Sequence, residues 1–153
     1  MQLFVEPEEL RRQGVRQFGL DAWIDSAPFE ELVGLTIEEA GGGRAVLTLP
    51  FRVKLANGGG VMHGGAMVTL ADTAVAMAIK SLLPEGTIFA TTDLRMEFIA
   101  PVLEGVVTAR AEVEGPDGRV FLGRAELAGA DGQLFARFSS TFRVARRQSR
   151  GDG

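Results

Sequence analysis

One segment of the sequence, residues 64–83, constrains the fold more than any other. It contains no proline and few β-branched residues, so it favours a helix that ends before Pro84. Apolar or small residues lie on nearly every side of this helix: Ala66, Met67, Val68, Leu70, Ala71, Ala74, Val75, Ala76, Met77, Ala78 and Ile79. A helix that is hydrophobic all round must be buried all round. The rest of the chain therefore has to surround it.

The surrounding elements are predicted to be strands. Residues 35–39 and 44–50 predict a hairpin round the turn Ala40-Gly41-Gly42-Gly43. After Thr91 the sequence holds strand-length runs separated by the turn signals Gly-Pro-Asp-Gly and Ala-Asp-Gly, and with residues 91–98 they predict a four-stranded meander. The simplest fold is α+β, in which a curved antiparallel sheet of about six strands wraps round one long central helix.

Two weaker helical signals precede the hairpin. Residues 7–23 are weakly helical. In the segment that follows, Ser26 can cap a short second helix, Pro28 suits its first turn and Gly34 suits its exit. We therefore expect short helices before the first strand.

Length and composition fit a single domain. The chain has 153 residues, of which 46% are hydrophobic, which is enough for one sizeable core. We expect one domain over residues 1–153, with a core at about 29–144, a helical N-terminal segment at 7–33 and a flexible tail at about 146–153. No internal repeat is visible.

Several functional classes are disfavoured. Zero cysteines exclude disulfides and thiolate chemistry and fit a reducing compartment, and the charged first twenty residues do not resemble a signal peptide. No breaker-free apolar run reaches about 18 residues, so we expect a soluble, cytoplasmic protein without a membrane partner. The net charge of −4 argues against nucleic acid as a partner. The basic residues near the C-terminus are interpreted as a solvated tail, or alternatively as a local phosphate contact: Arg143, Arg146, Arg147 and Arg150.

Metal and nucleotide chemistry also lack the residues they need. The single histidine has no acidic partner at ligand spacing, so we expect no metal and no cofactor. No serine lies in a G-x-S-x-G elbow, and no Walker-type loop is present. Gly58 and Gly60 begin a dinucleotide-type loop, but His63 stands where the third glycine should be.

A small set of residues remains as candidates: Asn57, His63, Gly64, Gly65, Asp72 and the pair Thr91-Thr92. Each has a structural alternative, since the glycines can serve turns and close packing, and His63 can cap the helix. Asp72 is harder to assign to structure. A carboxylate among buried alanines costs several kcal/mol unless it is paired, protonated or open to a cavity. Burial also raises its pKa, which suits a general base near neutral pH.

The start of the same helix offers a second chemical group. Its unpaired N–H groups and positive dipole end can hold a carbonyl that becomes an oxyanion, and Gly64 and Gly65 let a substrate approach. Gly64 and Asp72 are about 12 Å apart along the helix axis, too far to act on one carbonyl within one chain. A symmetric dimer solves this when the Gly64 amide of one chain faces Asp72 of the other.

The pattern N-x5-H-G-G-x6-D, formed by Asn57, His63-Gly64-Gly65 and Asp72, resembles the hotdog-fold acyl-CoA thioesterases. The strand sequence TTDLRMEFIAPV is also similar, and the resemblance runs from about Phe29 to Val144. Within the 4-hydroxybenzoyl-CoA thioesterase superfamily it points to the phenylacetate-pathway (PaaI-type) branch. It implies thioester hydrolysis without a metal, by a dimer with a continuous sheet that usually pairs into a homotetramer.

The resemblance also implies residue roles. Asp72 matches the catalytic carboxylate, as general base or nucleophile, and Gly64 matches the amide that polarises the thioester carbonyl. Asn57 matches the residue that places the carbonyl or the water, and His63 supports that loop. Thr91 matches a residue that holds the attacking water. Gly65 and Thr92 are expected to contact the substrate.

Other functions remain open on the sequence alone. A hydroxyacyl-thioester dehydratase could use His63 and Asp72 as its acid and base, and a non-catalytic acyl-CoA sensor could use the same pocket. The acyl group is expected to be aromatic or of medium length, with phenylacetyl types entering by resemblance. Phenylalanines at alternate strand positions could line a pocket, although they more often form core: Phe89, Phe98, Phe121, Phe135, Phe138 and Phe142.

Overall fold

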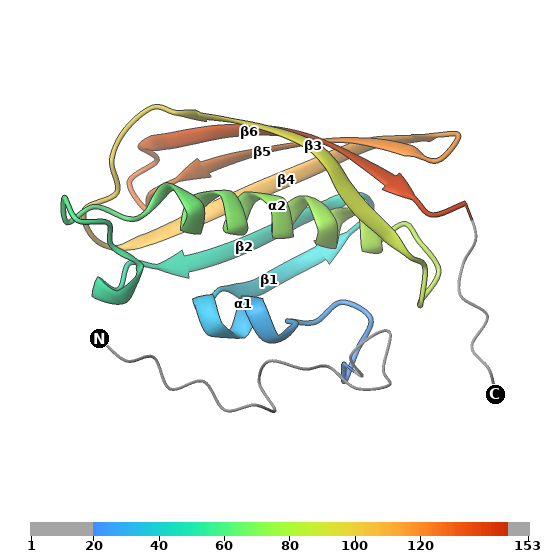
Figure 1. The fold of residues 1–153 in the computed structure, drawn as a ribbon, viewed down its shortest axis with the longest axis horizontal. Helices are drawn as coiled ribbons and strands as arrows, with labels where there is room; N and C mark the ends of the chain where they lie inside the picture. The colour runs from blue at the N-terminus through green and yellow to red at the C-terminus, as the bar shows by residue number, and fades with distance from the viewer. Residues whose placement is uncertain (1–19, 147–153) are drawn as a thin grey trace, which may run out of the picture.

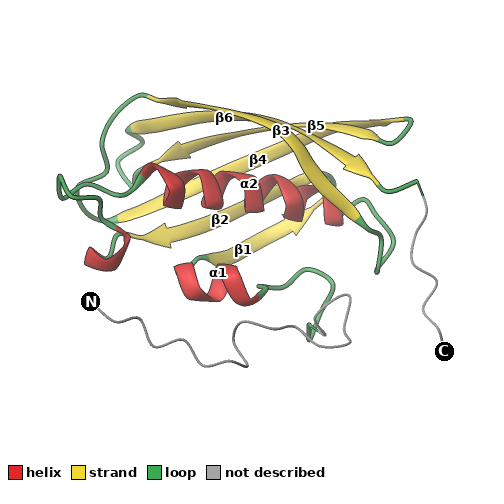
Figure 2. Cartoon of the chain, in the orientation of Figure 1, coloured by secondary structure: helices red, strands yellow, loops and turns green. Residues whose placement is uncertain are grey.

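The fold is a curved antiparallel sheet with one long helix lying along it (Figure 1). The structure, a computed structural model, describes residues 20–146. Its elements, coloured by type in Figure 2, are α1 (Pro28–Val33), β1 (Thr36–Gly41), β2 (Arg44–Pro50), the single 3-10 turn η1 (Val53–Leu55), α2 (Gly64–Lys80), β3 (Phe89–Phe98), β4 (Val106–Asp117), β5 (Val120–Ala128) and β6 (Leu134–Val144). The predicted α+β architecture of about six strands and a central helix is confirmed.

The strand order corrects one prediction. The six strands pair in the order β1-β2-β4-β5-β6-β3, so β4, β5 and β6 form a meander, and β3 pairs with β6 instead of β4. The predicted four-stranded meander is therefore wrong. A meander needs tight turns, whereas residues 99–105 lead from β3, at one edge of the sheet, to β4, which lies between β2 and β5. This crossing is tied down where Met62 donates its N–H to the Val102 carbonyl at 2.9 Å.

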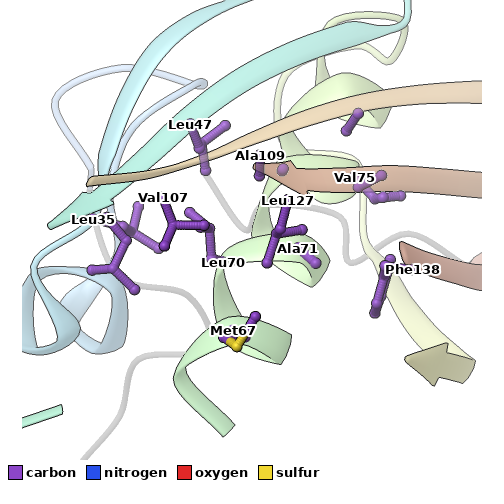
Figure 3. Packing of buried hydrophobic residues seen from close by; sticks show 14 of the residues in the cluster. Leu35, Leu47, Met67, Leu70, Ala71, Val75, Val107, Ala109, Leu127 and Phe138 are labelled. Carbon is purple, nitrogen blue, oxygen red and sulfur yellow. The ribbon is translucent and has the colours of Figure 1, made fainter. Parts of the chain in front are cut away.

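Helix α2 forms the centre of the core. Leu70, Ala71 and Val75 are completely buried, and Figure 3 shows them against Leu47 and other side chains of the sheet. Small residues set the closeness of this packing. A Cβ atom added at Gly123 of β5 would collide with the Val75 side chain. The burial that the sequence predicts for this helix on every side is found on most of its sides.

The helix boundaries differ from the prediction in two places. Helix α2 ends at Lys80 rather than Leu83, because the N–H groups of Leu82 and Leu83 donate to carbonyls three residues back instead of four. Side chains also bind carbonyls of the last turn: Ser81 Oγ donates to Ala78 O at 2.6 Å and Trp23 Nε1 to Lys80 O at 3.0 Å. Helix α1 ends at Gly34 as predicted, with φ of 88°. Ser26 does not cap it, because the helix begins one residue later, after Ala27.

The expected helix over residues 7–23 lies mostly outside the described residues, and residues 20–23 of it are not helical. The expected tail from about residue 146 also lies outside them. Within residues 20–146, no helix has the length and apolar character needed to cross a membrane.

Candidate functional site

The loop before α2 is organised by Asn57. Its Oδ1 accepts the N–H groups of Gly59 at 2.9 Å and Val61 at 3.3 Å. Its backbone closes the same loop, because Asn57 N donates to Val61 O at 2.8 Å and Asn57 O accepts from Gly60 N at 3.0 Å. The side-chain oxygen and the backbone of Asn57 thus hold the loop together. The side-chain nitrogen, Nδ2, is left for other contacts.

His63 is the N-cap of α2 and leaves one backbone amide uncommitted. Its Nδ1 accepts the Gly65 N–H at 2.8 Å, so the proton of the neutral ring lies on Nε2. Its carbonyl accepts the N–H groups of Ala66 at 2.9 Å and Met67 at 3.4 Å. Among residues 20–146, the Gly64 N–H has no acceptor. Gly64, not Gly65, is therefore the amide that this helix start offers to a ligand.

Asp72 lies in the middle of α2, half-buried, and has one hydrogen-bond partner. Thr91 of β3 donates its Oγ1 proton to Asp72 Oδ1 at 2.9 Å. The other oxygen, Oδ2, has no partner among the described residues. Asp72 is therefore oriented by one neighbour and keeps one oxygen for a water or a substrate atom.

Burial is the main cause that raises the pKa of Asp72 above its ordinary value. The Thr91 hydrogen bond acts against this by stabilising the charged carboxylate, and the negative charge of Glu30 adds a smaller upward contribution to the pKa. This environment keeps a carboxylate more basic than one in water, as proton abstraction near neutral pH requires.

We predict that Thr91→Val raises the pKa of Asp72 further. The change removes a donor that favours the charged form while keeping the shape of the side chain, so protonation should occur at higher pH. The shift can be followed in the carboxyl ¹³C resonance of Asp72 across a pH titration. Thr92→Val serves as the matched control and should leave this resonance unmoved. An unchanged titration in Thr91→Val would show that the hydrogen bond does not form in solution.

Thr92 occupies a different environment from Thr91. The β3–β6 ladder changes register between Thr91 and Asp93, which leaves Thr92 as the extra residue of a β-bulge. Its hydroxyl donates to Thr141 O at 3.2 Å and its side chain is exposed. The bulge thus separates the two threonines, and only Thr91 contacts Asp72.

Two separate hollows contain four of the candidate residues, whereas His63, Gly65 and Thr92 line neither of them. One, of about 650 Å³, runs beside the C-terminal half of α2 and is lined by Asp72, Thr91 and residues from β3, β6 and the segment before α1. The other, of about 380 Å³, lies at the start of α2 and is lined by Asn57, Gly64 and the Phe98 side chain among others. The two hollows share no residue. One chain therefore separates the carboxylate from the free amide, as the axial spacing predicts.

Sequence reasoning missed the residues that border the Asp72 hollow on its outer side. Trp23 and Glu30 line it from the N-terminal segment, and Lys80 lines it from the last turn of α2. The six phenylalanines divide between roles. Phe89 and Phe142 line the Asp72 hollow and Phe98 lines the other one, whereas Phe121, Phe135 and Phe138 are buried in the core. The sequence pattern does not connect Trp23 with Lys80, because 57 positions separate them.

Within residues 20–146, no group of three or more histidine, cysteine, aspartate or glutamate side chains is placed to hold a metal ion. Among the polar groups of the two hollows are the Asp72 carboxylate, the Thr91 hydroxyl and the free Gly64 amide. A carboxylate base and an amide donor together suit the attack of water on a carbonyl carbon.

A sequence profile of the Thioesterase superfamily matches residues 59–136. Among curated relatives, the 1,4-dihydroxy-2-naphthoyl-CoA hydrolase of Listeria monocytogenes is 33% identical over 84 residues, which are 54% of this chain and 68% of that protein. The chain spans between about half and two thirds of the length of the curated relatives it matches.

Solved structures match over a larger share of the chain. A conserved protein of Pseudomonas aeruginosa has 31% identity and a TM-score of 0.77, covering 82% of this chain and 100% of its own. A variant of the phenylacetic acid degradation protein PaaI from Thermus thermophilus has 30% identity and a TM-score of 0.71, covering 78% of this chain and 100% of its own. Both matches include the whole of the related chain.

Proposed function

Because the chain belongs to the Thioesterase superfamily and has the hotdog fold, we propose that it hydrolyses an acyl-CoA thioester to a free acid and coenzyme A. We assign it to the PaaI-type branch, supported by the H-G-G-x6-D pattern and by the likeness to the Thermus thermophilus protein. The proposed acyl group is aromatic or of medium length.

One observation carries this proposal. Asp72 is a half-buried carboxylate on an otherwise apolar helix, oriented by Thr91 and open to a hollow of about 650 Å³. Burial of a carboxylate lowers the stability of the fold, so its presence here points to a function that outweighs this cost. General-base or nucleophilic catalysis fits the position of Asp72 and its raised pKa, and either role would serve the thioester hydrolysis for which the family is named.

The chemical step needs few groups. With Asp72 as general base, Oδ2 takes a proton from water while the water oxygen bonds to the thioester carbonyl carbon. The carbonyl oxygen becomes an oxyanion held by a Gly64 N–H, and the C–S bond then breaks to release the coenzyme A thiolate and the acid. With Asp72 as nucleophile, its oxygen bonds to that carbon, coenzyme A leaves as the thiolate, and water hydrolyses the resulting anhydride.

In this proposal two chains build each active site. Asp72 and Gly64 line different hollows of one chain. A two-fold symmetric dimer brings the Gly64 amide of one protomer to the Asp72 carboxylate of its partner and generates two equivalent sites. The outermost strand β3 is available for a continuous sheet between protomers, and we propose that dimers pair further into a homotetramer.

The test is thiol release from a panel of acyl-CoAs with benzoyl, phenylacetyl, butyryl, octanoyl and palmitoyl groups. Turnover of at least one thioester, with equal amounts of acid and free thiol, is expected. If a coenzyme A ester binds without releasing thiol, the protein is a sensor rather than an enzyme. Hydration of an enoyl thioester without thiol release would instead favour the dehydratase, although His63 and Asp72 do not meet within one chain.

A further inference from the structure

Trp23 and Lys80, which both line the Asp72 hollow, contact each other in three ways. Trp23 Nε1 donates to Lys80 O at 3.0 Å, and Lys80 Nζ donates to Trp23 O at 3.0 Å. The same ammonium lies 4.5 Å from the centre of the Trp23 ring, within the range of a cation–π contact. We call these two residues the latch. It fixes the segment before α1 onto the last turn of α2.

The spacing of residues along α2 sets the distance between the latch and the Asp72 carboxylate. Asp72, Ala76 and Lys80 are spaced four residues apart, so they follow one side of α2, and all three line the hollow. From Asp72 to Lys80 the helix rises about 12 Å. Ala76 lies between them and leaves the floor of the hollow open, because its side chain is a single methyl group. The space beside Asp72 therefore extends along the helix as far as the latch.

The other walls of this space are largely apolar and partly aromatic. Phe89 and Phe142, whose ring centres are 5.9 Å apart, line it from the sheet, and Ile88 and Ala27 add aliphatic surface. Aromatic rings attract a flat apolar group by their area and by edge or offset contacts. Polar side chains also line the hollow: Asp72, Thr73, Thr91, Glu30, Glu85, Thr87 and Lys80. This is the composition of a pocket for a small apolar group attached to a polar one.

We infer that the latch is the far wall of the acyl pocket and limits the substrates to compact acyl groups, either one aromatic ring with a short arm or a straight chain of up to about eight carbons. The length follows from the rise of about 12 Å less one van der Waals contact of about 3.5 Å, because an extended chain advances about 1.2 Å per bond. This inference rests on the proposed thioesterase function. Trp23 and Lys80 act here as specificity residues and touch no reacting atom.

The test compares chain-length preference in latch variants. Trp23→Ala opens the far wall, so kcat/KM for palmitoyl-CoA relative to octanoyl-CoA is expected to rise at least tenfold, mainly through a lower KM for the long chain. Lys80→Met removes the ammonium contacts and keeps an apolar stem of similar length, so a smaller rise is expected. Trp23→Phe keeps a ring at the wall and should stay close to the wild type.

Phe29→Ala is the matched control, because Phe29 is an exposed aromatic residue of the same region that does not line the hollow. It should leave the preference unchanged. A ratio within twofold of the wild type in both Trp23→Ala and Lys80→Met, with both proteins folded, would overturn the inference. If Trp23→Ala does not fold, the inference is tested by the chain-length preference of Lys80→Met and by the fluorescence titration described next.

A binding measurement separates failure of this inference from failure of the proposed function. Trp23 is the only tryptophan of the chain, so its fluorescence reports directly on the latch. Titration of the wild type with octanoate or phenylacetate should change the emission with saturation. If the wild type hydrolyses no thioester, the proposed function is overturned. If the wild type is active and these acids inhibit it without changing the Trp23 emission, the latch is not a wall of the acyl pocket.

Discussion

Asp72→Asn is expected to lower kcat/KM for thioester hydrolysis about a hundredfold or more while the protein stays folded. The substitution keeps the shape of the side chain and replaces the basic oxygen with an amide that can neither take a proton nor attack a carbon. Thr91 Oγ1 can still donate to the remaining Oδ1, so the local hydrogen bond survives. Burial of a neutral amide should also cost less than burial of a charge, so the melting temperature should not fall.

Thiol release measures this loss on the best substrate of the wild type. Asp117→Asn is a suitable control, because Asp117 lies in the exposed β4–β5 hairpin, away from both hollows, and should retain full activity. A folded Asp72→Asn protein with activity within fivefold of the wild type would exclude Asp72 as the base and as the nucleophile.

Mixing two inactive variants should restore activity. Gly64→Pro removes the free N–H of the helix start and Asp72→Ala removes the carboxylate, so each homodimer lacks one group in both of its sites. In a heterodimer one site loses both groups and the other keeps both. Random exchange makes about half of the dimers heterodimers, so recovery of about a quarter of the wild-type activity is expected.

The proline variant is designed to preserve the helix. Proline is favoured in the first turn of a helix, and the extended backbone of His63, with φ of −58° and ψ of 134°, is the conformation that a residue before proline prefers. Gly64→Ala is the control: its Cβ meets the Phe98 ring at 3.1 Å, as the proline Cβ does, but it keeps the N–H. It should therefore retain more activity than Gly64→Pro. Absence of rescue in purified heterodimers, isolated through two different affinity tags, would contradict a shared site.

Local patterns predicted the elements of the fold better than their arrangement. Helix α2 and the six strands follow from composition and period, because burial on all sides or on one face leaves a direct trace in the sequence. The partner of β3 leaves no such trace. The two alternative partners, β4 and β6, have a similar alternating pattern. Only the path of residues 99–105 past the helix decides between them. The end of α2 also differs from the prediction, because the N–H groups of Leu82 and Leu83 donate to carbonyls three residues back instead of four.

The candidate site was predictable to a similar extent. Asp72 is conspicuous in the sequence because a charge stands among apolar residues, and His63-Gly64-Gly65 precedes it at a specific spacing. The sequence did not reveal that His63 binds the Gly65 amide and leaves only the Gly64 amide free, since this depends on the conformation of the ring. Nor did it reveal the latch, because Trp23 and Lys80 meet only after the N-terminal segment has folded back onto α2.

Strand β3, at one edge of the sheet, connects the Asp72 half of the site with the Gly64 half. Its first residues include Thr91, which binds Asp72, and its last residue is Phe98, whose ring covers Gly64. One side of this strand pairs with β6, and the other has no strand partner among residues 20–146. Whatever pairs with that open side will protect from hydrogen exchange the β3 N–H groups that point away from β6, and it will order both ends of the strand at once. Exchange along β3 thus reports on assembly of the site without any substrate.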